Sequence, residues 1–253
     1  AVGPNLAGQL GGTDGITLTY GKTTDKGTLA FNNERAPLND PRVREALRLG
    51  VDHEAIIKAI GAGNTLYGPI PPTDPGYEDL AKLVPFDPAK AKALLKEAGQ
   101  EDLQLTLTIP SFYGTTVSTV LVSMYNDIGV TLKVNAVEFN TWLEDVYTNK
   151  DYDLSFVLHV EARDFGNWAN PEYYFNYDNP KVQQLYAEAM ASTDQAKVDA
   201  LLAEAARIVS SDNAADWLYN AETVTALRPG ITGFPVDSIN ARLNLANVEV
   251  SSE

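Results

Sequence analysis

The most constraining feature of the sequence is a strand–helix–strand pattern between residues 103 and 137. Apolar residues recur with strand periodicity in Leu103–Ile109 and Val130–Val137, and a helical pattern over roughly Thr115–Ile128 lies between them. These three segments predict a βαβ unit with parallel strands and a right-handed crossover. The chain is therefore expected to be an α/β protein with a mainly parallel sheet flanked by helices.

Other segments extend this sheet and its helical cover. The apolar stretch Asp153–Val160 predicts another strand, and it follows a short helix through Trp142 and Val146. N-capping aspartates, proline at the first helical position and helical apolar spacing predict further helices. They begin at Asp40-Pro41, Asp52 and Asp87-Pro88, and two more cover Pro180–Met190 and Asp194–Ser211.

The two ends of the sequence have a weaker pattern. Residues 16–31 are interpreted as a hairpin, because extended runs lie on both sides of the turn-like Asp25-Lys26-Gly27. Trp217–Val250 is interpreted as short extended pieces broken by Pro229-Gly230 and Gly233-Phe234-Pro235.

The charge balance excludes several classes of partner. The 253 residues contain 34 Asp and Glu against 19 Lys and Arg, a formal charge of −15, which repels nucleic acid and anionic lipid surfaces. No apolar stretch is long enough to cross a bilayer. The absence of cysteine removes disulfides, thiolate catalysis and cysteine-ligated metal.

The candidate site is the loop after the predicted strand Asp153–Val160. Ligands of open α/β sheets bind beyond the carboxyl ends of the strands. Residues 159–171 follow such an end, and they combine both signs of charge with aromatic side chains. An equally weighted alternative is a surface loop whose charges pair with each other. The candidate ligand-binding residues in and just after this loop are His159, Glu161, Arg163, Asp164, Trp168 and Tyr173.

Catalytic and metal sites find little support in the sequence. His159, Glu161 and Asp164 can imitate a metal site, but one histidine beside two carboxylates is common by chance, so no metal is expected. His53, in a first helical turn, is expected on the surface. A hydrolase with Glu161 or Asp164 as base beside His159 is an alternative, yet the sequence offers no nucleophile in a recognisable motif.

A set of motifs in fixed order resembles the family 5 solute-binding proteins, the oligopeptide- and dipeptide-binding components of bacterial ABC importers. The similarity covers about residues 28–250. Its motifs are Phe31-Asn32-Asn33, Pro37–Leu47, Asp87–Gly99, Ile128-Gly129-Val130, Tyr152-Asp153, Tyr177-Asp178-Asn179-Pro180 and Gly233-Phe234.

The resemblance implies a particular domain organisation. Family members are about twice this length, so the chain is expected to be the C-terminal lobe of a periplasmic-binding-protein-like fold of type II, cluster C. Residues 1–28 would form an inter-lobe segment, 29–227 the ligand-binding lobe, and 228–253 a segment that returns to the missing first lobe. The signal for export would then lie outside this sequence.

The resemblance also implies the function and the partners. The two lobes would close on an extracellular peptide and deliver it to the permease subunits, without catalysis and without a cofactor. Asp164 is the nearest counterpart of the family aspartate that pairs with the peptide ammonium, and Glu161 is the substitute. Arg163 would clamp a carboxylate. Trp168 and Tyr173, with Tyr174, would supply apolar walls, although core packing is expected for at least one of the three. The resemblance places the protein outside the cytoplasm as a surface lipoprotein, with an oligosaccharide or metal chelate as the alternative solute.

Overall fold

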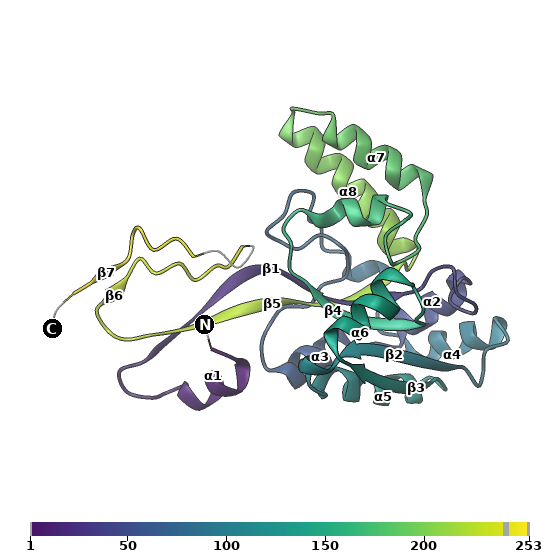
Figure 1. Ribbon diagram of the computed structural model, residues 1–253, viewed down its shortest axis with the longest axis horizontal. Coiled ribbons are helices and arrows are strands. Elements are labelled where there is room, and N and C mark those ends of the chain that lie inside the picture. Colours follow the sequence, from purple (N-terminus) through teal and green to yellow (C-terminus); the bar gives the residue numbers. More distant parts are fainter. Residues whose placement is uncertain (1, 240–242, 252–253) are drawn as a thin grey trace.

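The computed structural model describes residues 2–239 and 243–251, and it has a five-stranded sheet with helices on both faces (Figure 1). The strands lie in the order β3-β2-β4-β1-β5. Their bounds are β1 Thr17–Phe31, β2 Gln104–Pro110, β3 Thr131–Val137, β4 Leu154–His159 and β5 Ala215–Leu227.

The α/β class and the βαβ unit are confirmed, but the sheet is mixed rather than mainly parallel. β2 is parallel to both β3 and β4, with helix α5 (Thr116–Asp127) as the crossover between β2 and β3. β1 is antiparallel to β4 and to β5. These antiparallel pairings are not evident from the sequence, because β1 and β5 each look like several short extended pieces.

The hairpin expected at residues 16–31 is wrong, because this stretch is one continuous strand of 15 residues. Its partner strand β5 pairs with both halves, and the register shifts between Lys22 and Lys26 and between Gly27 and Thr28. The turn-like Asp25-Lys26-Gly27 therefore forms a bulged stretch of strand. Lys26 opposes His159 of β4 and is 2% exposed, so tertiary pairing overrides the local turn signal.

The expectation that the chain from Trp217 onward forms only short extended pieces is also wrong for its first part. Residues 215–227 form one strand of 13 residues whose first half is buried, so the breakers at Pro229-Gly230 act only after it has ended. Beyond it, β6 (Ile231–Thr232) and β7 (Glu249–Val250) form a separate two-stranded sheet.

The helices follow the capping signals closely. α2 (Pro41–Leu49), α3 (His53–Ile60) and α4 (Pro88–Glu97) begin after Asp40, Asp52 and Asp87, each of which accepts a backbone N–H bond with its side chain. α7 (Pro180–Met190) and α8 (Gln195–Ser211) match the predicted ranges. His53 is the exception, since it is 3% exposed and pairs with Asp216 of β5 rather than facing solvent.

Alternation along the strands creates one apolar core on each face of the sheet. Leu29 and Phe31 of β1 point into a core that α2, α3, α4 and α5 complete. Ala30, between them, faces the opposite core with Trp217 of β5. That second core is covered by α7, α8 and the short α6 (Phe139–Trp142), and it lies beneath the candidate loop.

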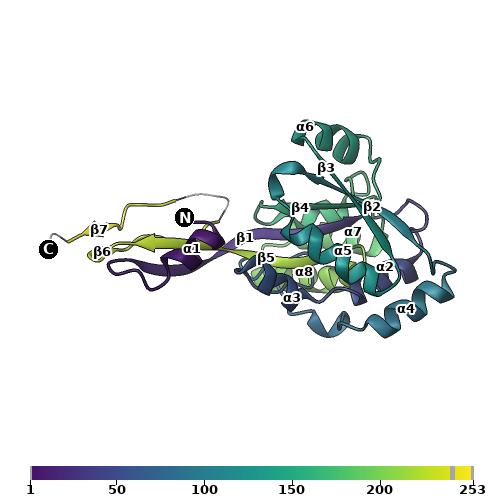
Figure 2. The ribbon, with the colours of Figure 1, turned by 90° about the horizontal axis from the view of Figure 1, so that it is seen from below.

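β1 and β5 extend together beyond the helices that cover the main sheet, as a two-stranded ribbon. Figures 1 and 2 show the ribbon extending away from the helices, with α1 (Pro4–Leu10) and the β6–β7 sheet beside it. Strand β1 runs through residue 28, and β5 ends at 227. The division into 1–28, 29–227 and 228–253 stays a prediction, and residues 1, 240–242 and 252–253 of its terminal segments lie outside the described residues.

Candidate functional site

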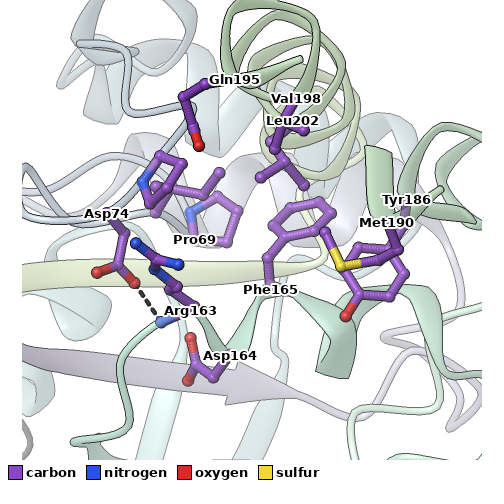
Figure 3. A pocket seen from close by; sticks show the side chains of 12 residues that line it. Pro69, Asp74, Arg163, Asp164, Phe165, Tyr186, Met190, Gln195, Val198 and Leu202 are labelled. Atoms are coloured by element: carbon purple, nitrogen blue, oxygen red, sulfur yellow. Dashed lines mark hydrogen bonds between the residues drawn. The ribbon is translucent and has the colours of Figure 1, made fainter. Parts of the chain in front are cut away.

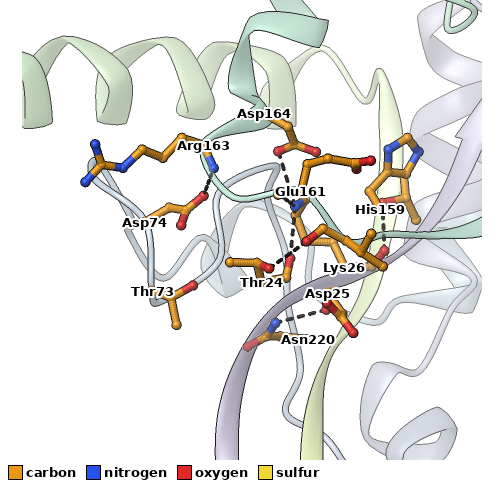
Figure 4. A network of polar contacts seen from close by, with 12 residues as sticks. Thr24, Asp25, Lys26, Thr73, Asp74, His159, Glu161, Arg163, Asp164 and Asn220 are labelled. Carbon is orange, nitrogen blue, oxygen red and sulfur yellow. Dashed lines mark hydrogen bonds and ion pairs between the residues drawn. The ribbon is translucent and has the colours of Figure 1, made fainter. Parts of the chain in front are cut away.

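The candidate site is built where β4 ends beside the bulge of β1. β4 finishes at His159, residues 160–163 turn away, and a 3₁₀ segment, Asp164–Ala169, follows. Thr24 of β1 donates to the carbonyl of Val160 at 2.6 Å and holds the turn against the bulge. Asn220 of β5 donates to the carbonyls of Thr23 and Asp25, which fixes the bulge from its other side (Figure 4).

A buried lysine lies at the centre of this arrangement. The Nζ of Lys26 lies 3.2 Å from Asp164 Oδ1, and it donates to the carbonyls of Thr24 at 3.0 Å and Glu161 at 3.2 Å (Figure 4). Three acceptors match the three N–H donors of an ammonium. The site thus holds one cation supplied by the protein itself.

Carboxylates nevertheless outnumber cations around it. Asp25, Asp74, Glu161 and Asp164 are electrostatically coupled here, against the cations Lys26 and Arg163. Burial raises the pKa of Asp164; the Lys26 ammonium offsets only part of that effect, and Glu161 and Asp74 add to it. Burial also raises the pKa of Asp25, although Lys26 acts against it. The site therefore favours an additional positive charge.

His159 is neutral and locked in place. It is 8% exposed, stacks on Tyr174 and has its Nε2 2.9 Å from the Tyr174 hydroxyl. Burial, together with the nearby Lys26 charge, lowers the pKa of His159 to about 3. A neutral imidazole with this tight packing supports the floor of the site and adds no charge to it.

Arg163 connects the turn to the proline-rich loop at residues 68–76. Its φ of 57° is in the left-handed region, which is unusual for a side chain of this size. The backbone N–H of Arg163 donates to Asp74 Oδ2, so Asp74 holds the turn in this conformation. The guanidinium itself is exposed beside this contact (Figure 4).

A cavity of about 160 Å³ opens next to Asp164 (Figure 3). Its walls come from the proline-rich loop, the 3₁₀ segment and helices α7 and α8. The lining residues are Pro69, Ile70, Asp74, Pro75, Arg163, Asp164, Phe165, Tyr186, Met190, Gln195, Val198 and Leu202. Most are apolar, and the charged ones all belong to the network around Asp74 and Asp164.

The structure brings together four of the six candidate residues around Lys26, keeps the Tyr173 ring 6.4 Å from that of His159, and places Trp168 in the core. His159, Glu161, Arg163 and Asp164 surround the Lys26 network. Trp168 is 4% exposed and stacks on Phe175 at 4.0 Å, so it is part of the core. Tyr173 is half-buried and packs edge-on against Tyr147 at 5.7 Å.

A metal ion would have to compete with the protein's own cation. Ligand atoms of His159, Glu161 and Asp164 lie within 4.8 Å of one another. Lys26 Nζ, however, already contacts Asp164, and His159 already bonds with Tyr174. The donor set therefore fits an ammonium better than a metal.

With this geometry in place, the comparisons with known proteins define the family. Residues 2–180 match the bacterial extracellular solute-binding proteins, family 5 Middle. The chain belongs to this family. Heme-binding protein A of Haemophilus influenzae is 29% identical over 242 residues, which cover 87% of this chain and 43% of that protein. The dipeptide-binding protein of Escherichia coli is 51% identical over 77 residues, covering 30% of this chain and 14% of that protein.

A solved structure supports the fold of this family 5 chain. The periplasmic binding protein DppA from Helicobacter pylori, in complex with the peptide STSA, has a TM-score of 0.85 at 20% identity. The match covers 100% of this chain and 52% of that one. The chain thus spans about half the length of the proteins it matches. In the part of the chain that the structure describes, no helix combines the length and apolarity needed to span a membrane.

Several residues of this candidate site are not evident from the sequence. Lys26 was assigned to a turn, and Asp74 lies in a loop whose prolines and glycines dominated its interpretation. Lys26 lies two residues before the extended run Thr28–Phe31. A lysine this close to a buried strand is a signal for a charge that needs a partner. The apolar walls on α7 and α8 look like ordinary core positions in the sequence.

Proposed function

We propose that this chain is the ligand-binding lobe of a solute-binding protein that captures peptides for an ABC importer, with Asp164 as the anchor of the peptide ammonium. Peptide binding belongs to several relatives by name, among them the dipeptide-binding protein of Escherichia coli. The proposal transfers that class of ligand to this chain. No bond is made or broken, and the energy for transport would come from a separate ATPase.

The observation that carries the proposal is the position of Asp164, which follows the end of β4, is 10% exposed and has Lys26 as its one ion-pair partner among the described residues. A carboxylate that burial penalises, and that a single lysine compensates incompletely, gains from any further cation at hydrogen-bonding distance. A peptide's ammonium supplies that cation together with three donors. Exposed Glu161 and half-buried Asp25 lie close enough to add their charge.

Binding measurements on the longest natural form of the protein test the proposal. Di- to pentapeptides are titrated by calorimetry, each beside its N-acetylated counterpart, which lacks the ammonium. We expect acetylation and Asp164→Asn each to weaken binding by roughly tenfold or more, as expected for loss of a charge-assisted bond. Asp127→Asn, at an exposed position on α5, is the matched control and should bind like the unchanged protein. Equal affinity for acetylated and free peptides would contradict the ammonium anchor.

Heme is the second candidate ligand, since a relative covering 87% of this chain is named a heme-binding protein. Exposed aromatic side chains follow the carboxyl ends of β2 and β3, at the same edge of the sheet as the end of β4. Phe112 is 64% exposed and Phe139 44% exposed, and their rings lie 5.8 Å apart. A hemin titration followed by porphyrin absorbance separates the candidates. Saturable binding that peptides do not displace would favour heme over peptide.

The remaining parts of the proposal concern location and partners. Capture of external solutes requires a position outside the cytoplasm, with attachment through a lipid anchor or through the permease. A second lobe would complete the site and the permease subunits would receive the solute. Fractionation of cells that express the full-length protein, with detection in the membrane and outer fractions, tests the location.

A further inference from the structure

Strand β1 forms a large bulge directly before Lys26. The ladder with β5 shifts register between Lys22 and Lys26, where residues 23–25 of β1 oppose Ala221 alone. A bulge takes backbone groups out of the ladder, and buried backbone carbonyls then need other donors. The first two residues of the bulge are buried. Neighbouring side chains must therefore supply the donors that hold it.

Asn220 of β5 supplies two of these donors. Its side-chain amide donates to the carbonyl of Thr23 at 3.2 Å and to that of Asp25 at 3.0 Å (Figure 4). An asparagine amide has two N–H donors, and the two carbonyls use both. Asn220 is 3% exposed, and its backbone exchanges two hydrogen bonds with Asn64, at 2.9 and 2.8 Å. The residue that holds the bulge is thus itself fixed from the other side of β5.

The two carbonyls that Asn220 binds lie on either side of Thr24. The carbonyl of Thr24 accepts from Lys26 Nζ at 3.0 Å, and the same nitrogen lies 3.2 Å from Asp164 Oδ1. Fixing the residues before and after Thr24 therefore fixes the direction of its carbonyl and, through it, the position of the ammonium. Asn220 does not line the cavity beside Asp164, so its effect on that carboxylate passes through Lys26.

We propose that Asn220 is a positioning residue of the ligand site, which holds the Lys26 ammonium against Asp164 by fixing the β1 bulge and so sets how much of the Asp164 charge a ligand cation can use. The effect on a ligand rests on the proposed function, whereas the link from Asn220 to Asp164 does not. Without Asn220 the ammonium is held less firmly, so burial of Asp164 is compensated less and its neutral form is favoured. A ligand cation then needs a higher pH to bind.

Titration of the Asp164 carboxyl without ligand tests this link in the longest natural form of the protein. The side-chain carboxyl carbon is followed by NMR against pH, and its signal is identified by its loss in Asp164→Asn. We expect Asn220→Ala to move the midpoint to higher pH, and Lys26→Met to move it further in the same direction. The double variant should titrate like Lys26→Met alone, because the effects of residues in one network do not add. A purely structural role for Asn220 would lower stability and leave the midpoint unchanged.

Matched variants keep this titration decisive. Asn64→Ala removes an exposed amide that bonds with Glu222 and keeps the backbone bonds to Asn220, so it should leave the midpoint unchanged. Asn220→Ala should fold, because Thr73 also donates to the Thr23 carbonyl at 3.4 Å. Asn220→Ser retains one donor and should give a smaller shift in the same direction, and it provides the test if Asn220→Ala fails in thermal unfolding. An unchanged midpoint in the folded variant, or a further shift in the double variant, would overturn the proposal.

Peptide binding provides the second arm. The tightest-binding peptide of the di- to pentapeptide series is titrated by calorimetry at pH 7.5 and pH 5. The ratio of the two affinities should be about three- to tenfold larger in Asn220→Ala than in the unchanged protein, because a midpoint displaced by one pH unit changes the charged fraction up to about tenfold. Equal ratios would overturn the effect on the ligand. If no peptide binds the unchanged protein, the proposed function fails, and the NMR titration still decides the link between Asn220 and Asp164.

Discussion

The ion pair of Arg48 with Asp216 in the core and the pair of Lys26 with Asp164 at the end of β4 are both nearly sealed from water, yet their carboxylates differ. Both side chains of the core pair are 0% exposed, while Lys26 and Asp164 are 2% and 10% exposed. Burial tends to raise the pKa of both carboxyl groups. Around Asp216, His53 and Arg48 more than offset burial and the pKa is lowered, whereas the pKa of Asp164 stays raised.

The difference follows from the number of partners. Asp216 Oδ1 lies 3.0 Å from His53 Nε2 and 3.3 Å from Arg48 Nε, and Arg48 also donates to the carbonyl of Tyr67 at 3.2 Å. Asp164 has Lys26 as its one ion-pair partner among the described residues, and Glu161 and Asp74 repel it. A buried carboxylate such as Asp216, whose two cationic partners outweigh the effect of burial on its pKa, serves the fold. A buried carboxylate such as Asp164, for which the neighbouring cation offsets only part of the effect of burial, is stabilised further by a cation from a ligand.

The largest expected effect is the loss of the core pair. Asp216→Asn should lower the free energy of unfolding by about 3–5 kcal/mol at pH 7, because it leaves Arg48 buried without its anion. Asp164→Asn should cost clearly less, since Lys26 keeps two carbonyl acceptors and the nearby charge of Asp25. Urea unfolding of both variants measures the contrast. Equal losses would mean that the two pairs have the same structural role.

Acid should affect the site region before the core pair. The pKa of His159 is about 3 in the folded protein and near 6.5 when unfolded, so the folded state holds fewer protons in this window. Stability from neutral His159 is therefore lost as the pH falls from about 6.5 towards 3, by roughly 2–4 kcal/mol at pH 4. The contribution of Asp216, whose folded pKa is lowered from 3.8, is lost only below that value. Urea unfolding of His159→Gln against pH should show a flatter slope between pH 6.5 and 4, and an unchanged slope would contradict this assignment.

The contrast between local and distant contacts also explains how far the sequence could predict the fold. The caps at Asp40, Asp52 and Asp87 and the βαβ pattern are signals within a few residues, and the structure confirms them. The long strand β1 was missed because its turn-like bulge is stabilised by β4 and β5, which lie far along the chain.

The sequence predicts the loop that contains Asp164 but not its pairing with Lys26. The carboxyl end of β4 identified the loop with Asp164, because that edge follows from the strand order of an α/β sheet. Lys26 lies on another strand, and no periodicity links it to Asp164. Trp168 illustrates a different difficulty. An aromatic residue in a loop looks the same in sequence whether it faces a ligand or the core, and Trp168 faces the core.

A smaller effect should follow from removing the cation of the site. Lys26→Met leaves Asp164 without its ammonium, so its pKa should rise further and the carboxyl should take up a proton. Stability should fall by about 1–2 kcal/mol at pH 7.5, less than for a sealed core pair. Because a raised folded pKa stabilises the protein below that pKa, part of the loss should return at pH 5. Lys22→Met, at an exposed position of the same strand, is the control with little expected change. Equal losses at both pH values would contradict the link to Asp164.

The smallest effect concerns protons released on ligand binding. An ammonium that bonds with Asp164 favours its charged form and so lowers its pKa from the raised value towards the ordinary 3.8. Between those two values the complex holds fewer protons than the free protein, so binding should release less than one proton and tighten as the pH rises through this window. Calorimetry in buffers of different ionisation heat counts the protons. The core pair contacts no ligand, so an Asp164→Asn variant that still binds should release none, and proton uptake by the unchanged protein would show that Asp164 is not the carboxylate that receives the cation.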